Sequence, residues 1–211
     1  MTTIHQYLNK YPVDPDSKTL IIGTIHPHNV GMFKLDFFYG SEASIWNILS
    51  DAFPDELLKP VTLQSLQAFL KQRKISVSDT IVECNRKNPT ALDSDLIPVK
   101  LNHDLIRQIR DSSIDHLVFT SGFGKNNAFR LFYTGLLGQP ITDELKRQRN
   151  FILPDKFFGR PLQVTIVYSP SGAANISLSR SKEFKANRHL FAESKRPVYD
   201  FKVWVYKQVF R

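Results

Sequence analysis

The chain has 211 residues, 42% of them hydrophobic and 23% charged, which suffices for one folded core and argues against a mainly disordered chain. Lys and Arg number 28 against 20 Asp and Glu, so the formal net charge of +8 favours phosphate-rich or otherwise anionic partners. The lone cysteine, Cys84, excludes an internal disulfide framework and a cysteine-rich zinc site. Apolar runs fall short of the roughly 20 residues of a membrane span, and the polar start lacks a signal-peptide pattern. We therefore expect a cytoplasmic protein without a membrane partner, associated with the nucleoid if it is bacterial.

Short runs rich in β-branched and apolar residues predict four strands, at 19–23, 76–84, 116–120 and 163–168. Apolar residues at helical spacing lie between them, at 45–53, 63–70, 105–109 and 128–136. This alternation predicts an α/β fold of three layers, α/β/α, with a mostly parallel central four-stranded sheet. Because neither a repeat nor a linker-like stretch interrupts the pattern, we expect a single domain over residues 1–211.

The C-terminal stretch 197–211 fits two kinds of element. Pro197 at a first helical position, followed by apolar residues near helical spacing, favours a helix. The alternation from Lys202 to Tyr206 also fits a strand, and periodicity leaves both open. A basic stretch precedes it, either as a solvated helix face or as a surface for an anionic partner: Arg180, Lys182, Lys185, Arg188, Lys195 and Arg196.

Two histidines and a proline follow the first predicted strand, where the ligand crevice of a parallel α/β sheet opens. His26 can exchange protons near neutral pH, and Pro27 favours an extended backbone at the residue before it. A loop histidine is also commonly a plain surface residue. The sequence therefore offers His26 as a candidate catalytic residue beside that simpler interpretation.

Two further loops carry candidate binding residues. Phe37, Phe38 and Tyr39 precede Gly40, and such rings either fill a core or provide a platform on which a planar base stacks. After the fourth predicted strand, the small residues of 169–175 allow close backbone approach to a ligand, and their N–H groups suit a phosphate. An ordinary turn explains the same residues.

The second predicted strand and the residues directly after it supply Asp79 and Asn85 as candidate base-binding residues. Their carboxylate and amide groups suit the edge of a nucleobase, but such groups also cap elements or pair with Arg86 and Lys87. The glycine-containing stretch 121–127 is a weak signal for a phosphate cradle, and it lacks the spacing of a Walker motif.

Four pieces in this order resemble the uracil-DNA glycosylase superfamily, most closely its mismatch-specific and hypoxanthine-DNA glycosylase-like branches. They are a strand ending in a G-x-x-P-like segment, an aromatic pair before a segment with Trp46, a second strand of the form D-x-x-x-x-C-x-R-K, and a late P-S-G loop. The resemblance covers about residues 19–180. It implies a protein that flips a base out of DNA and hydrolyses the N-glycosidic bond, leaving an abasic site, with no metal or organic cofactor. We expect this protein to be a monomer.

Carried over position by position, the resemblance assigns roles with several departures. His26 stands where the family has the Asp or Asn that positions the attacking water, in a loop one residue longer. Phe38 matches the ring that stacks on the extruded base. Ala43 falls where the hypoxanthine-type branch has a catalytic Asn, and Ser169 replaces a His or Asn.

The remaining assignments concern DNA contact. Ser169 opens a loop that matches the family's clamp on the DNA backbone, which continues through Pro170, Ser171 and Gly172. We assign His26 and Ser169 as catalytic, and the base-binding set as Phe38, Ala43, Asp79 and Asn85. Lys182, Lys185 and Arg188 are expected to contact DNA phosphates.

These departures leave two main hypotheses. One is a DNA glycosylase with weak activity or an altered scope, acting on a deaminated or modified base in a pocket widened by small residues. The other is a catalytically impaired protein of the same fold that still binds DNA. A hydrolase of nucleotides or small molecules ranks last, because a net charge of +8 exceeds what such a ligand needs.

Overall fold

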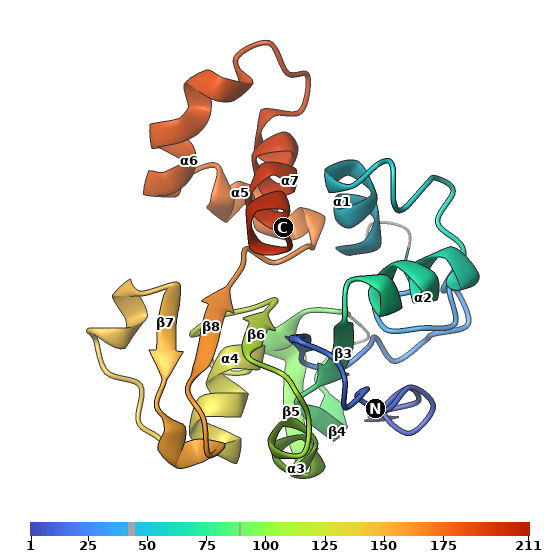
Figure 1. Cartoon of the computed structure of the whole chain (residues 1–211), viewed down its shortest axis with the longest axis vertical. Coiled ribbons are helices and arrows are strands. Elements are labelled where there is room, and N and C mark those ends of the chain that lie inside the picture. Colours follow the sequence, from blue (N-terminus) through green and yellow to red (C-terminus); the bar gives the residue numbers. More distant parts are fainter. Residues whose placement is uncertain (42–44, 89) are drawn as a thin grey trace. The chain divides into compact units, whose positions relative to one another are not determined.

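The structure is a computed structural model and describes residues 1–41, 45–88 and 90–211. The chain divides into two compact units (Figure 1). The first unit comprises Met1–Met32 and Leu70–Val167, and the second comprises Phe33–Phe69 and Tyr168–Arg211. Each unit has a hydrophobic cluster of its own. The expected single domain over residues 1–211 stays a prediction.

The main sheet of the first unit has five strands in the order β3-β2-β6-β8-β7. Figure 1 labels β3, β6, β8 and β7 of this sheet. Their bounds are β2 Thr19–Gly23, β3 Ile75–Asp79, β6 His116–Phe119, β7 Asn150–Leu153 and β8 Leu162–Ile166. The pairs β3-β2, β2-β6 and β6-β8 are parallel, whereas β7 pairs antiparallel with β8. The prediction of a four-stranded sheet was therefore wrong, because it missed the antiparallel edge strand β7. This strand is too short to show a clear period in the sequence.

A second, antiparallel sheet has the order β1-β4-β5, formed by Thr2–Ile4, Ile81–Arg86 and Leu96–Leu101. The single strand predicted at 76–84 is divided between the two sheets, β3 in one and β4 in the other. Thr80 makes the break, because its N–H and hydroxyl both donate to the Gly23 carbonyl at 3.0 Å. The chain thus leaves the main sheet where β3 ends.

Helices α3 (Asp104–Arg110) and α4 (Ala128–Arg130), the latter extended by the π-helix η2 (Leu131–Leu136), pack on the main sheet. Alternate residues of β2, β6 and β8 form the sheet side of this cluster, namely Leu20, Ile22, Leu117, Phe119, Val164 and Ile166. This period of two is typical of a strand that presents one face to a helix layer. The described helices of the first unit account for one such layer, and the full three-layer arrangement stays a prediction.

The second unit is helical. It contains α1 (Ile45–Ala52), α5 (Asn175–Leu178), α6 (Lys182–Asn187) and α7 (Pro197–Val209), while α2 (Leu63–Gln72) begins in it and ends in the first unit. The C-terminal stretch is therefore a helix, and Phe201 of α7 packs against Leu178 and Phe184. Short 3-10 turns complete the chain: η1 Asp93–Asp95, η3 Leu145–Arg147, η4 Asp155–Phe157, η5 Gly172–Ala174 and η6 Arg188–Phe191. Within the described ranges, the helices are all too short or too polar to cross a membrane.

Candidate functional site

The carboxyl ends of β2 and β3 place several polar side chains together. These strands are parallel, and Gly23 at the end of β2 lies opposite Asp79 at the end of β3. The loop after β2 carries His26, and His5 follows β1, which pairs with the continuation of the chain in β4. Three ionisable side chains thus meet at the edge of the sheet where α/β proteins bind ligands.

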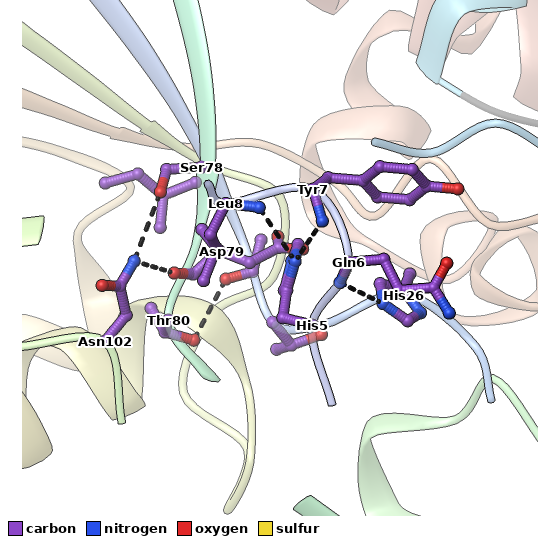
Figure 2. Close-up of polar contacts among 12 residues, drawn as sticks. His5, Gln6, Tyr7, Leu8, His26, Ser78, Asp79, Thr80 and Asn102 are labelled. Atoms are coloured by element: carbon purple, nitrogen blue, oxygen red, sulfur yellow. Dashed lines mark hydrogen bonds and ion pairs between the residues drawn. The ribbon is translucent and has the colours of Figure 1, made fainter. Parts of the chain in front are cut away.

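His5 and Asp79 form a buried hydrogen bond (Figure 2), with 2.8 Å between His5 Nε2 and Asp79 Oδ2. The other ring nitrogen, Nδ1, accepts from the backbone N–H groups of Tyr7 and Leu8 at 3.1 and 3.3 Å. Because Nδ1 accepts, the proton of the neutral ring is on Nε2 and is donated to the carboxylate. The second carboxylate oxygen, Oδ1, is buried and lacks a hydrogen-bond partner within the described chain.

His26 lies beside His5, with 4.9 Å between the ring centroids, and it is 5% exposed. Its Nε2 accepts from the N–H of Gln6 at 3.0 Å, and its Nδ1 lies 2.7 Å from the carbonyl oxygen of Pro27 (Figure 2 shows the first of these bonds). One neutral tautomer, protonated on Nδ1, satisfies both contacts. Burial is the main reason that the pKa of His26 lies below its ordinary value.

A buried arginine holds the His26 loop in place. Arg86, at the end of β4, donates from NH2 to the His26 carbonyl at 2.6 Å and from NH1 to the Thr90 carbonyl at 2.9 Å. Its Nε donates to Thr3 Oγ1 at 3.1 Å. The guanidinium therefore ties β1, β4 and the loop after β2 together, and this limits the movement of the imidazole.

A second acidic side chain, Asp93 of η1, accepts from Thr24 Oγ1 at 2.9 Å. Burial raises the pKa of Asp93, while hydrogen bonds from Thr24 and Ser121 oppose that shift. Asn85 of β4, in contrast, is exposed, and its side-chain oxygen accepts from Thr2 Oγ1 at 2.9 Å. Of the base-binding residues predicted in this unit, Asp79 thus belongs to the histidine cluster, and Asn85 lies on the second sheet.

The predicted stacking ring lies in the second unit. Phe38 is 1% exposed, and its ring contacts Phe37 edge-on at 5.3 Å between centroids. The indole Nε1 of Trp46 donates to the Phe38 carbonyl at 2.7 Å. Both contacts fix Phe38 as part of the packed interior of this loop, so stacking on a base requires the ring to be uncovered.

The predicted backbone-binding loop is also in the second unit. Ser169 Oγ accepts from Ser171 N at 3.3 Å, and Ser171 Oγ accepts from Ala173 N at 3.3 Å. Both Ser171 and Gly172 are exposed. The loop is therefore a pair of serine turns with its backbone open to a ligand.

The three predicted basic residues near the C-terminus, Lys182, Lys185 and Arg188, are all exposed, on α6 and at the start of η6. Ser181 caps the N-terminus of α6, because its hydroxyl accepts from Phe184 N at 3.1 Å. Phe184 is buried and turns the basic residues of the helix outward. Ala43 lies outside the described residues. Across the ranges that the structure describes, His, Cys, Asp and Glu side chains do not gather into a group of three that could hold a metal ion.

Sequence reasoning missed His5 and did not recognise the buried Lys202. His5 stands in a short polar N-terminal stretch, and its partner Asp79 is 74 residues away, so no local pattern marks it. Lys202 had a signal, because it lies four residues after Val198 on a helix face that is otherwise apolar.

Comparisons with known proteins give one structural match. No family model matches the sequence, and no curated protein matches it. The fold is similar to a solution NMR structure from Methanosarcina acetivorans described as a "putative Uracil DNA glycosylase", with a TM-score of 0.53 and 15% identity over 100% of both chains. This likeness supports a uracil-DNA-glycosylase-like α/β fold, as the four motifs predicted. At this identity it concerns the fold alone.

Proposed function

We propose that this protein is a DNA glycosylase that hydrolyses the N-glycosidic bond of a deaminated or modified base and leaves an abasic site. The observation that carries the proposal is the likeness, over the whole of both chains, to the M. acetivorans structure. The net charge of +8 and the exposed basic residues of α6 and η6 are consistent with a DNA partner.

In this proposal the cluster at the ends of β2 and β3 acts on the scissile bond. Water attacks the anomeric carbon, the bond to the base breaks, and the base leaves with its electron pair. Asp79 is a suitable acceptor for a water proton or a base N–H, because Oδ1 has no partner within the described chain and His5 holds Oδ2. His26 is the second candidate for positioning the water.

A catalytically impaired DNA-binding protein of the same fold is the second candidate. It is favoured by the contacts of His26, since Gln6 and Pro27 engage both of its ring nitrogens. An imidazole held in this way has no lone pair left for water unless one of these contacts opens.

The deciding experiment is incubation of the protein with DNAs carrying deaminated and hypermodified bases, followed by mass spectrometry of released bases. The glycosylase proposal expects at least one free base and an abasic site, and loss of release in Asp79→Asn. Asp104→Asn, at an exposed carboxylate on α3, is the matched control and should leave release unchanged. Absence of release from every DNA, with salt-sensitive DNA binding retained, would refute the enzyme and support the binding protein.

DNA binding itself is tested on the basic residues of α6 and η6. Neutralising Lys182, Lys185 and Arg188 together should weaken binding and make it less sensitive to salt. Each lost phosphate contact lowers the slope of log affinity against log salt by about one. An unchanged slope would place the phosphate contacts elsewhere.

A further inference from the structure

The second unit contains a cavity of about 440 Å³ that the proposed reaction does not use. It lies among α1, α7 and the start of α5, and two residues of the 169–172 loop also line it. The charged and polar side chains that matter to the argument are Asp51, Lys59, Asn175, Arg196, Tyr199 and Lys202. A cavity of this size accommodates a ligand as large as a nucleotide.

Lys202 is a buried cation in the wall of this cavity. The residue is 1% exposed, and its ammonium donates to the Ser171 carbonyl at 3.1 Å and to Asn175 Oδ1 at 2.7 Å. Within the described chain it makes no ion pair with a carboxylate, and burial alone lowers its pKa to about 8. Buried charges in proteins are usually balanced by an opposite charge, whereas the two hydrogen-bond acceptors of the Lys202 ammonium, the Ser171 carbonyl and Asn175 Oδ1, are both neutral.

The one carboxylate in the described cavity wall is already engaged. Asp51 accepts from Lys59 Nζ at 2.6 Å and from the Tyr199 hydroxyl at 2.6 Å. Burial raises the pKa of Asp51, but the hydrogen bonds from Lys59 and Tyr199 outweigh it and hold the pKa below its ordinary value. Asp51 therefore stays ionised and balances Lys59.

Arg196 supplies a second positive charge, which helps to lower the pKa of Asp51 through space. Its guanidinium lies over the ring of Tyr199, 4.6 Å from the centroid, and the side chain is exposed at the cavity. A stacked guanidinium is restricted in orientation and keeps its N–H groups available at the edge. With Asp51 and Lys59 balanced, Arg196 and Lys202 leave the cavity with two positive charges.

We propose that this cavity binds a phosphate group, with Arg196 and Lys202 as its cationic ligands. A phosphate dianion balances both charges, and the planar guanidinium matches two phosphate oxygens at once. The inference stands on the charges of the cavity and does not require the glycosylase reaction. The phosphate belongs either to a free ligand, such as a phosphomonoester, or to a DNA backbone.

The first test titrates inorganic phosphate into the full chain by calorimetry. Wild type should bind, and Arg196→Gln should weaken binding roughly tenfold or more, the usual cost of a charge-assisted hydrogen bond. Lys207→Gln, at an exposed lysine of α7 outside the cavity wall, should change affinity by less than about twofold. Asp51→Asn removes the negative charge and should tighten binding. Absence of binding to wild type, or equal affinity in Arg196→Gln, would overturn the proposal.

The second test uses sulfate, an anion whose charge stays constant across the range, to follow Lys202 by pH. In the empty cavity Lys202 has a pKa of about 8, and a bound anion raises it. Affinity should be constant below about pH 7 and fall by up to about tenfold per pH unit above about pH 8. A flat profile in wild type would refute the role of Lys202, and this test needs no substitution of the buried lysine.

Other titratable groups near α7 do not account for that profile. Those on the helix and on the elements packed against it are Asp51, Lys182, Glu183, Lys185, Arg188, His189, Tyr199, Asp200, Tyr206 and Lys207. Burial is the only cause of the lowered pKa of Lys202, so none of these charges sets it. The pKa values of Tyr199 and Tyr206 are raised by burial, which moves their titration further above the tested range.

A competition experiment identifies the source of the phosphate. A short DNA duplex is added to the phosphate-bound protein, and DNA binding of Arg196→Gln is measured against salt. Displacement of phosphate, with a salt slope reduced by about one, assigns the cavity to the DNA backbone. Retention of phosphate beside bound DNA assigns it to a free phosphate ligand. Both results support the phosphate site. Absence of phosphate binding to wild type in the calorimetric titration overturns the site for either source.

Discussion

The hydrogen bond between His5 and Asp79 should be energetically coupled, and a double-mutant cycle measures this coupling. His5→Ala removes the hydrogen-bond donor of the buried Asp79 carboxylate, for which we expect a loss of about 3–5 kcal/mol in the free energy of unfolding. Asp79→Ala removes the carboxylate that the His5 ring contacts and should cost about 1–3 kcal/mol. The double variant removes both members of the pair, so its loss should be smaller than the sum by about 2 kcal/mol.

The assay is urea-induced unfolding at neutral pH of wild type, the two single variants and the double variant. The slope of the unfolding free energy against urea concentration is compared among these four proteins. The Asp104–Arg107 pair of α3 is the control, because both side chains are more than half exposed and their distance is also 2.8 Å. Its cycle should give about 0.5 kcal/mol or less. Additive losses at His5 and Asp79, within about 0.5 kcal/mol, would refute the coupling and with it the geometry of the cluster.

Two further predictions concern stability. The pKa of His26 is lowered by burial, so the unfolded chain binds more protons below about pH 6.5, and stability should fall by up to about 1.4 kcal/mol per pH unit until the folded histidine also titrates. Between about pH 7.5 and about pH 5, the urea midpoint of unfolding should change less with pH in His26→Asn than in wild type. A variant whose midpoint falls with acid as much as that of wild type would contradict this. Gly40→Ala places a Cβ 2.0 Å from the Leu35 carbonyl oxygen and should destabilise by about 1–3 kcal/mol, whereas Gly172→Ala meets nothing within 4 Å and should change stability by less than about 0.5 kcal/mol. Equal effects of the two alanines in thermal unfolding would contradict the tight turn at Gly40.

Two of the parallel strands, β2 and β6, were predictable because each is a short, buried and largely apolar run bounded by turn residues. The structure pairs these two strands in parallel. β5 was not predictable, because Pro98 interrupts it and most of its residues face solvent or are half-buried. Its pairing with β4 follows from contacts that the local sequence does not display.

The candidate site was predictable only in its position. The turn after β2 marked His26, whereas Asp79 was predicted inside a strand over 76–84. The structure ends β3 at Asp79, which brings its carboxylate to the edge of the sheet that the His26 loop also occupies. The partners of these side chains come from the N-terminal segment, where His5 binds Asp79 and Gln6 binds His26. Such contacts between distant segments decide whether an imidazole is available for chemistry, and residue type alone does not.

The C-terminal helix α7 determines where Lys202 lies relative to the cavity. A strand over 202–206 would place Lys202 and Trp204 on one face, whereas the helix buries Lys202 and leaves Trp204 37% exposed. The helical register puts Lys202 beside Phe201 on the inner side of α7, where its ammonium reaches Ser171 and Asn175. Burial of a lysine ammonium in that position destabilises the folded protein through desolvation, and a bound anion offsets this cost. The apolar pattern around Lys202 therefore predicts the helix and the burial of this lysine, and the proposed anion would offset the cost of that burial.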